Sequence, residues 1–431
     1  IFHYIEVYLY MIICVIGSGG REHAICKSIH HSPKVKKIFC IPGNAGTQEL
    51  AENVDLNIDD HDSLIKFLNE SKVDLVIVGP EKPLVNGITD VLEKNNIKVF
   101  GPRKVPSQLE GSKNFTKEIC KKYDIPTAKF GVFETIDDTL NFLKNSNFPI
   151  VIKADGLAAG KGVYISKNFK DSENAVKEIF GGKFGNAKKI LVEEFLKGEE
   201  MSFFIVCDGK NFKFFQTAQD HKRVGEGDEG KNTGGMGSYS PSGLINKNLE
   251  KKIINKIIIP TLKAINDLGE KYKGFLYAGL MISNDEPFLI EYNVRMGDPE
   301  CQTILPLLET DLIDIFIACC NEKLDKLEIK WSEKKSLCIV LCSNGYPESF
   351  KKNIKINNLK NLVLNKNDFV FHAGTKKVNN ELLSDGGRVL NFVSISSSFK
   401  SSRERVISLI NQLNWRNGFF RKDIGFKIID K

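Results

Sequence analysis

The order of hydrophobic and polar positions predicts alternating strands and helices from residue 11 onward. Met11–Ile16 is a continuous apolar run, as expected for a strand buried on both faces of a parallel sheet. The glycine turn Gly17–Gly20 follows, and then a helix that we expect to end near His31. We predict further strands at 37–41, 75–78 and 99–100, and helices at 63–70 and 86–95. This alternation predicts a doubly wound α/β domain over residues 11–111.

Residues 112–321 follow a different pattern. We predict strands at 150–153, 163–165, 190–193, 279–283 and 288–292. The turn at Asn284–Pro287 joins the last two strands as a hairpin, which indicates an α+β arrangement. Residues 322–431 are rich in predicted strands, with a helix at 401–413, and we expect them to form a small C-terminal α+β domain. The sequence therefore predicts a multidomain protein with three units.

Composition and charge narrow the functional classes. The chain has 61 Lys and Arg against 54 Asp and Glu, but it has no long basic block, so we expect no nucleic-acid partner. The ten cysteines form no zinc pattern, which favours reduced thiols in the cytoplasm. The apolar stretch 1–16 contains His3 and Glu6 and resembles neither a signal peptide nor a membrane span. Residues 1–10 precede the first methionine, so we expect an upstream extension with Met11 as the natural start.

The first glycine turn is similar to a dinucleotide-binding fingerprint but departs from it. Glu22 stands where the third glycine is required, and no acidic residue follows the second predicted strand. A glycine turn at a helix N-terminus can instead bind a single phosphate, with Arg21 as an added donor. The loops 43–47 and 79–81 could be ordinary turns. Because they follow strands on the same edge of the sheet, the three loops together predict a substrate site.

A glycine-rich loop follows the predicted strand that ends at Lys153. It is not a Walker loop, since only three residues separate Gly156 from Gly160, and Gly162 stands where a Walker loop has Ser or Thr. We expect residues 154–163 to form a hairpin flap that closes over a triphosphate, with Lys153 pairing with phosphate charge at its base. A loop with only a structural role is the alternative.

Two acidic segments complete the pattern. Glu193–Leu196 follows a buried strand and could be a surface turn; beside the flap, it predicts the hinge that meets an adenine, with Glu200 reaching the ribose hydroxyls. Strand alternation would place Glu291, Asn293 and Arg295 on one face, about 7 Å between successive members. Two oxygen donors beside a guanidinium suit Mg²⁺ that bridges phosphates, with the arginine stabilising charge on the transferred group. A solvated polar face is the alternative.

These motifs, in this order, resemble those of the ATP-grasp enzymes and, among them, the phosphoribosylamine–glycine ligases. The resemblance runs from Met11 to about Lys427. Outside the nucleotide motifs it rests on Val15–His23, Pro42–Thr47, Leu109–Lys113, Gln219–Arg223, Asn232–Gly237, Gly297–Glu300, Phe371–Thr375, Gly386–Leu390 and Arg421–Gly425. It implies an ATP-grasp central unit and a cytoplasmic, monomeric enzyme that depends on Mg²⁺ (or Mn²⁺). Such an enzyme uses ATP to turn glycine into glycyl phosphate and passes the glycyl group to 5-phosphoribosylamine, giving glycinamide ribonucleotide in purine synthesis.

The resemblance also implies roles for residues at matching positions. ATP would be bound by Lys113, Lys153, Gly156, Gly160, Lys161, Gly162, Glu193, Glu194, Leu196 and Glu200, and the metal by Glu291 and Asn293. The sugar phosphate and glycine would be bound by Gly19, Gly20, Arg21, Asn44, Asp220, Lys222, Arg223, Arg295, Gly297, Asp298 and Pro299. The catalytic residues would be Lys153, Arg295 and Asp298.

Two alternatives remain beside this interpretation. The first is another ATP-grasp ligase, such as a carboxylase that uses bicarbonate, for which the segments 220–223 and 232–237 have no evident use. The second is a non-catalytic nucleotide-binding protein, which predicts loss of Glu291, Asn293 or Arg295, and all three are present.

Overall fold

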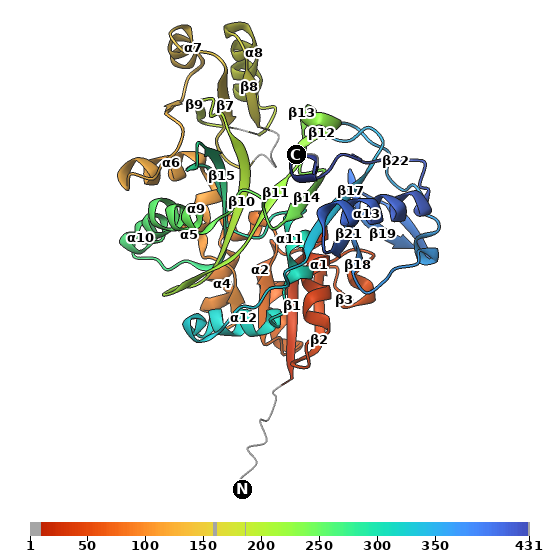
Figure 1. Ribbon diagram of the computed structural model, residues 1–431. Helices are drawn as coiled ribbons and strands as arrows, with labels where there is room; N and C mark the ends of the chain where they lie inside the picture. Colours follow the sequence, from red (N-terminus) through yellow and green to blue (C-terminus); the bar gives the residue numbers. More distant parts are fainter. Residues whose placement is uncertain (1–9, 158–161, 186, 430–431) are drawn as a thin grey trace.

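The N-terminal part of the chain forms a five-stranded parallel sheet with the order β3-β2-β1-β4-β5 (Figure 1). The structure is a computed structural model that describes residues 10–157, 162–185 and 187–429. The strands are β1 (Met11–Gly17), β2 (Val35–Pro42), β3 (Glu52–Asn53), β4 (Leu75–Val78) and β5 (Val99–Phe100), and the helices are α1 (Gly20–His30), α2 (His61–Glu70), α3 (Glu81–Asn86) and α4 (Ile88–Lys94). The strand order reverses between β1 and β4, which confirms the predicted doubly wound fold.

The central strand β1 explains why its sequence is a continuous apolar run. Ile13 and Val15 pack into one hydrophobic core, whereas Cys14 and Ile16 pack into another on the opposite face of the sheet. Successive side chains of a strand point to opposite faces, so a strand covered on both sides needs apolar residues at every position. The helix predicted at 86–95 is wrong in its bounds, because Gly87 separates α3 from α4.

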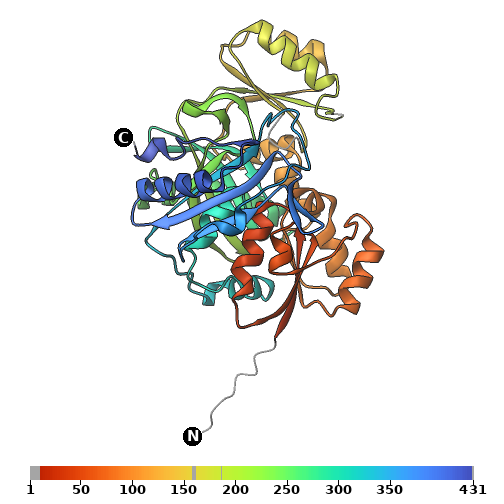
Figure 2. The same ribbon diagram turned by 90° about the vertical axis from the view of Figure 1, so that its right-hand side faces the viewer.

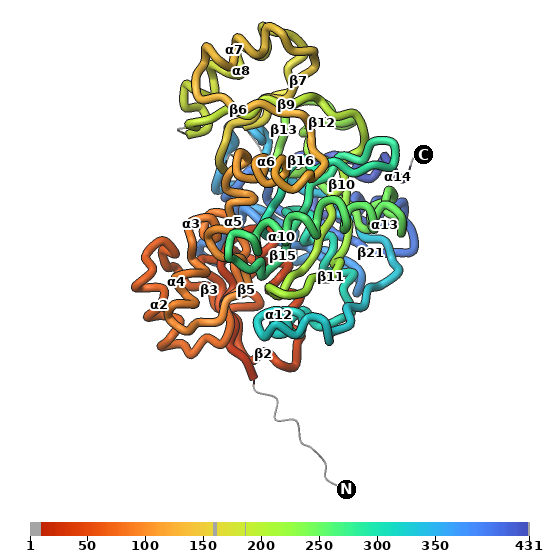
Figure 3. The backbone as a smooth tube through the Cα atoms, turned by 90° about the vertical axis from the view of Figure 1, so that its left-hand side faces the viewer, coloured from red at the N-terminus to blue at the C-terminus, as the bar shows by residue number. Residues whose placement is uncertain are grey.

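A small lobe stands apart from the rest of the molecule (Figures 1 and 3). It is a four-stranded antiparallel sheet with the order β6-β9-β7-β8. Its elements are β6 (Phe130–Phe133), α7 (Ile136–Lys144), β7 (Ile150–Ala154), β8 (Val163–Ser166), α8 (Phe169–Phe180) and β9 (Ile190–Glu194). The lobe has a separate core that includes Leu143, Ile152 and Val176. The helices α5 (Lys104–Gly111) and α6 (Lys113–Lys122) lead into it from the N-terminal domain.

A large sheet runs through the middle of the molecule in the order β16-β15-β10-β11-β14-β17-β21-β18. Its strands are β10 (Glu199–Asp208), β11 (Phe212–Asp220), β14 (Gly237–Ser240), β15 (Lys273–Ser283), β16 (Glu286–Asn293), β17 (Lys335–Ser343), β18 (Asp368–His372) and β21 (Arg388–Ser396), and β22 (Gly418–Phe419) pairs with β17. Because β14 pairs with β17, the strands after residue 321 continue the sheet of the central unit.

Short hairpins and helices complete the fold. The hairpins are β12 (Arg223–Gly225) with β13 (Glu229–Asn232), and β19 (Thr375–Val378) with β20 (Glu381–Ser384); the helices are α9 (Lys247–Ile253), α10 (Ile259–Asp267), α11 (Glu300–Ile304), α12 (Leu312–Cys320), α13 (Phe399–Leu413) and α14 (Phe426–Ile429). Helix α13 covers β17 and β21 (Figure 2). One hydrophobic core joins Val15, Phe215 and Phe392 from the N-terminal, central and C-terminal parts. Among the described residues, no helix is long and apolar enough to cross a membrane.

We expect Phe392→Ala to lower the free energy of unfolding by about 3–5 kcal/mol, because it leaves a cavity in the shared core. Phe392 is fully buried, whereas Val378 is 44% exposed, so Val378→Ala serves as the control and should change stability by less than about 0.5 kcal/mol. Urea unfolding of the three proteins measures both values. Equal stability of the two variants would contradict the shared core.

Candidate active site

Three loops meet at the carboxyl ends of the N-terminal strands, as the sequence predicts. The side-chain amide of Asn44 donates to the carbonyls of Ser18 (2.8 Å) and His372 (2.9 Å). Its oxygen accepts from the backbone N–H groups of Gly46 (2.8 Å) and Thr47 (3.0 Å). Asn44 therefore ties the first two loops to β18, and both ends of its amide are already bonded within the protein.

The carboxylate of Glu22 fills the space between the first and third loops. A Cβ atom added to Gly17, whose φ is +129°, would lie 2.4 Å from Glu22 Cγ, and one added to Gly79 would lie 2.1 Å from its Oε1. The same carboxylate accepts from the Gly19 N–H (2.6 Å) and from Arg21 Nε (2.7 Å). A dinucleotide pyrophosphate binds at this edge of a doubly wound sheet, and here Glu22 occupies it. The replacement of the third glycine thus has a structural reason.

Asp298 connects the N-terminal, central and C-terminal parts of the protein. Its Oδ2 accepts from the backbone N–H of Arg21 in the first turn of α1 (3.2 Å), and its Oδ1 accepts from Gln302 Nε2 (2.8 Å). The guanidinium of Arg388, on β21, lies 3.2 Å from Oδ1 and donates to the carbonyl of Gly234 (2.6 Å). Burial opposes ionisation of Asp298, but the charges of Arg388 and Arg21 outweigh it and lower the pKa of the carboxyl. This cluster forms a three-domain junction, which comprises Asp298, Arg21, Gln302, Arg388 and Gly234.

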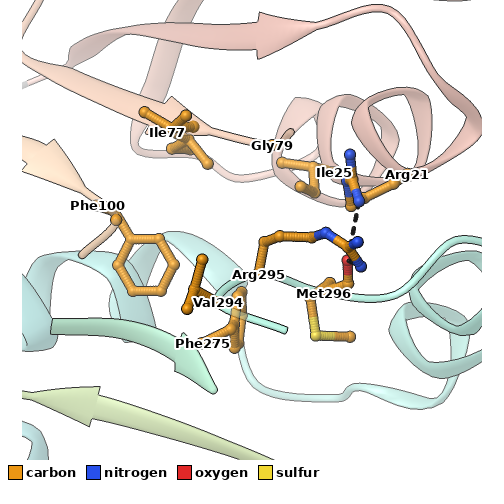
Figure 4. Close-up of a pocket in the computed structure, with 11 residues that line it drawn as sticks. Arg21, Ile25, Ile77, Gly79, Phe100, Phe275, Val294, Arg295 and Met296 are labelled. Carbon is orange, nitrogen blue, oxygen red and sulfur yellow. Dashed lines mark hydrogen bonds between the residues drawn. The ribbon is translucent and has the colours of Figure 1, made fainter. Parts of the chain in front are cut away.

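Arg295 lies next to this junction, between two carboxylates. Its Nε is 3.1 Å from Glu81 Oε2, and its Nη2 is 2.6 Å from Glu110 Oε1. The pairing with Arg295 lowers the pKa of Glu81 to about 2. Burial raises the pKa of Glu110 to about 7 despite the same arginine. Arg295 and Arg21 both line a small pocket, and Arg21 Nη1 donates to the Met296 carbonyl (3.0 Å; Figure 4).

The expectation that Arg295 shares a strand face with Glu291 and Asn293 is wrong. Strand β16 ends at Asn293, so side-chain alternation does not continue to residue 295. The guanidinium points instead to the N-terminal domain and to α5, where Glu81 and Glu110 hold it. Arg21, predicted as a phosphate donor, is likewise bonded through its guanidinium to protein groups.

A buried cluster of lysines and one glutamate lies at the base of the small lobe. Lys153 on β7 and Lys117 on α6 approach opposite oxygens of Glu193 on β9, at 2.5 Å and 2.6 Å. All three side chains are at most 5% exposed. Burial opposes the charge on Glu193, but the two lysines outweigh it and lower the pKa of the carboxyl. Lys113, at the start of α6, donates to the Gly156 carbonyl at the base of the predicted flap (2.8 Å).

The edge of the large sheet faces this cluster with oxygen ligands. Glu291 and Asn293 lie two residues apart on one face of β16. Glu291 pairs with Gly279 of β15, and Asn293 pairs with Tyr277. Lys222 Nζ lies 4.0 Å from Glu291 Oε1 and 3.2 Å from Glu200 Oε2. The sequence analysis assigned Lys222 to the binding of the sugar phosphate and glycine, whereas the structure brings its ammonium beside Glu291 and Glu200.

The donor set fits a metal ion that also uses phosphate oxygens. Glu291 and Asn293 supply one carboxylate and one amide oxygen, and Mg²⁺ commonly takes one or two protein oxygens together with substrate phosphates. In the part of the chain that the structure describes, no group of three His, Cys, Asp or Glu residues could hold a metal. Burial lowers the pKa of Lys113, and the charge of nearby Glu291 opposes this shift, so Lys113 lies close to the strand that bears Glu291 and Asn293.

The segment between β11 and β14 contributes the remaining predicted residues. Oδ1 of Asp220 is buried and has no hydrogen-bond partner among the described residues. Gly235 has φ +112°, and an added Cβ would lie 2.5 Å from Pro299 and 2.9 Å from Asp220 Oδ1, so only glycine fits there. Arg223 donates to the Gly230 carbonyl within its own hairpin (2.7 Å).

The predicted site residues thus fall into two groups around the large sheet. The nucleotide-side group contains Lys113, Lys153, Gly156, Gly162, Glu193, Glu194, Leu196, Glu200, Lys222, Glu291 and Asn293. The junction-side group contains Gly19, Gly20, Arg21, Asn44, Asp220, Arg223, Arg295, Gly297, Asp298 and Pro299. Gly160 and Lys161 lie outside the described residues. The sequence prediction missed Glu110, Lys117 and Arg388, although Glu110 and Arg388 lie within motifs that it quoted.

Three family models match the chain in succession. They are the phosphoribosylglycinamide synthetase N domain (residues 11–110), ATP-grasp (A) domain (111–301) and C domain (336–427). Phosphoribosylamine–glycine ligases of Brucella melitensis and Haemophilus influenzae are each 42% identical to the chain, over 98% of it and 99% of the relative.

Solved structures show the same relationship. The crystal structure of phosphoribosylamine–glycine ligase from Thermotoga maritima matches with a TM-score of 0.84 and 32% identity, over 96% of this chain and 100% of that chain. A biotin carboxylase from Campylobacter jejuni matches with a TM-score of 0.71 but 14% identity, over 93% of this chain and 91% of that chain, so the likeness to it concerns the fold alone.

We expect Glu110→Gln to change how stability depends on pH. The folded-state pKa of about 7 lies above the ordinary value of 4.5, so the folded protein binds this proton more tightly than the unfolded chain does. The resulting stability is fully present below pH 4.5 and is lost as the pH rises to about 7, in total about 3 kcal/mol. Urea unfolding between pH 5 and 8 should show this decline in the wild type and its absence in the variant. Glu118→Gln is the control, because Glu118 is exposed on α6. If stability depended on pH in the same way in the wild type and in Glu110→Gln, the raised pKa of Glu110 would be contradicted.

Proposed function

The chain belongs to the phosphoribosylglycinamide synthetase family, and from this premise we propose that its nucleotide side binds ATP while its junction side receives glycine and 5-phosphoribosylamine. The protein is an ATP-dependent ligase that joins these two substrates in purine biosynthesis. In the proposed sequence, the carboxylate of glycine attacks the γ-phosphate of ATP, giving glycyl phosphate and ADP. The amine of phosphoribosylamine then displaces phosphate and forms the amide bond of glycinamide ribonucleotide.

The observation that supports the nucleotide side most strongly is the buried lysine cluster facing Glu291 and Asn293. Lys153 and Lys113 would contact the phosphates, together with Gly156 and Gly162 of the flap. The strand end at Glu193, Glu194 and Leu196 would flank the adenine, and Glu200 would accept from the ribose hydroxyls. Positive charge at the base of the lobe thereby balances the triphosphate.

Glu291 and Asn293 would hold Mg²⁺ (or Mn²⁺), because they supply one carboxylate and one amide oxygen on one face of β16. When bound, the ion would neutralise charge on the phosphates during transfer. Asn293 suits this role because no hydrogen bond within the described residues engages its side-chain amide. Lys222, beside Glu291 and Glu200, would add positive charge where the γ-phosphate meets the carboxylate of glycine.

The junction side divides into groups that contact substrate and groups that position them. Asp220 has a buried, unpartnered carboxyl oxygen, which suits an N–H donor of a substrate. Asn44, Arg21 and Arg295 are bonded within the protein, so we assign them to positioning. Backbone groups at Gly19, Gly20, Gly297 and Pro299, the hairpin residue Arg223 and the catalytic candidate Asp298 would complete the acceptor region.

An assay of ADP release tests the reaction order. With ATP, Mg²⁺ and glycine but no phosphoribosylamine, we expect a burst of about one ADP per enzyme, because the glycyl phosphate has no acceptor. Addition of phosphoribosylamine should start steady turnover. ADP release that does not require glycine would contradict the proposed reaction. ADP release that requires bicarbonate instead of glycine would favour a carboxylase.

We expect Glu291→Gln and Asn293→Ala to weaken the apparent affinity for Mg²⁺ by roughly 10- to 100-fold, because Gln lacks the negative charge and second oxygen of the carboxylate and Ala lacks any oxygen ligand. Turnover measured against Mg²⁺ concentration at saturating ATP reports the shift. Glu286→Gln is the matched control, since Glu286 begins the same strand and pairs with Lys252 and Lys256 on the surface. Wild-type Mg²⁺ dependence in both test variants would exclude this metal site.

A further inference from the structure

Lys117 is a buried cation that the proposed reaction does not use. Its side chain is 3% exposed, and its ammonium contacts Glu193 Oε1 at 2.6 Å and Thr127 Oγ1 at 2.5 Å. A lysine is rarely buried this deeply unless its charge is paired, since transfer of an ammonium out of water is costly. Burial lowers the pKa of Lys117, which agrees with this cost.

The position of Lys117 follows from the helix that bears it. Lys113 begins α6, and Lys117 lies one turn further on the same face, because residues four apart in a helix are neighbours. Lys113 donates to the Gly156 carbonyl at the base of the flap, whereas Lys117 contacts the carboxylate of Glu193. Thr127, which accepts from Lys117, donates in turn to the carbonyl of Leu289 (2.6 Å) on β16. The lysine is therefore anchored to the strand that bears Glu291 and Asn293.

The charges of this cluster do not cancel. Glu193 carries one negative charge between the ammonium groups of Lys153 and Lys117, so the three groups together have a net charge of +1 when all are ionised. The ammonium of Lys117 lies 2.6 Å from Glu193 Oε1, so the two charges attract each other strongly. Without Lys117, the same carboxylate would neutralise Lys153 alone and leave a pair with no net charge.

We propose that Lys117 is a positioning residue for ATP, which shares the charge of Glu193 and so leaves Lys153 able to attract phosphate. The inference rests on the proposed assignment of Lys153 to the ATP phosphates. Lys117 itself contacts no part of the nucleotide in this proposal. Its effect reaches the substrate through Glu193 and Lys153, and it depends on how many phosphates the ligand has.

The test compares ligands that differ only in phosphate number. Calorimetric titration of the full chain measures the affinity for adenosine, ADP and a non-hydrolysable ATP analogue, the latter two with Mg²⁺. Lys117→Met removes the charge and keeps much of the side-chain volume; it should weaken binding of the ATP analogue by about 10- to 100-fold, ADP less, and adenosine by less than about twofold. Lys121→Met, an exposed position on the same helix, is the control and should bind all three ligands as the wild type does.

Two further variants separate charge from packing. Lys117→Arg keeps the positive charge and should bind the ATP analogue within a few-fold of the wild type. Lys117→Met combined with Glu193→Gln restores the net charge of +1, because Lys153 is then unpaired, and should recover most of the lost affinity. A purely structural role for Lys117 predicts a further loss in this double variant and equal losses for adenosine and the ATP analogue; either result would overturn the inference.

Lys153→Met distinguishes failure of this inference from failure of the proposed nucleotide side. If Lys153→Met leaves binding of the ATP analogue unchanged, the phosphate assignment itself is wrong, and the inference is lost with it. If Lys153→Met weakens binding but Lys117→Met does not, only the role of Lys117 is excluded. Should Lys117→Met not fold, the double variant still tests the proposal: shared charge predicts an affinity for the ATP analogue near that of the wild type, whereas a structural role predicts similar losses for all three ligands.

Discussion

The arrangement of the domains depends most on the hydrogen bonds and the ion pair of the Asp298 carboxylate, which is largely buried. It meets the N-terminus of α1, the side chain of Gln302 and the guanidinium of Arg388, and these groups come from three different domains. The partial positive charge of the helix N-terminus and the arginine both favour the ionised acid. Removal of this one carboxylate would leave the charge of the partly buried Arg388 without its counter-ion and the Arg21 N–H without its acceptor, which costs more than the loss of a surface ion pair. The acceptor side therefore keeps its geometry only while the three domains stay joined.

Ion pairing gives the two sides of the site opposite electrostatic character. Lys153, Lys117 and Glu193 sum to a positive charge at the base of the lobe, where the triphosphate is proposed to bind. Arg295 stands between Glu81 and Glu110, so that cluster is negative whenever Glu110 is ionised. The positive cluster at the base of the lobe suits a highly anionic nucleotide. Because the first cluster is buried and the second is partly buried, salt screens them less than it screens surface charge.

Local sequence patterns predicted the elements and loops of this protein better than its long-range pairings. The apolar run of β1, the glycine turn and the hairpin at Asn284–Asp285 depend on neighbouring residues, and the positive φ angles of +51° and +60° at that hairpin are those of a tight turn. The join between β14 and β17 depends on strands far apart in the chain, and no local pattern encodes it. The same holds for Glu110 with Arg295 and for Lys117 with Glu193. The placement of Arg295 failed for a related reason: alternation was continued past the last residue of the strand.

A resemblance between sequences identifies the residues of a site, whereas their hydrogen bonds indicate which of them are free to act. Arg21 and Asn44 match family motifs, but in the folded chain their polar groups are bonded to other parts of the protein. Asp220 and Asn293 match the same motifs and keep polar atoms with no partner among the described residues. An unsatisfied buried oxygen is costly in the empty site, and a ligand that satisfies it recovers that cost on binding. On the junction side, Asp220 keeps an unpaired oxygen and is therefore assigned to a substrate, whereas the saturated Arg21 and Asn44 are assigned to holding the site in place.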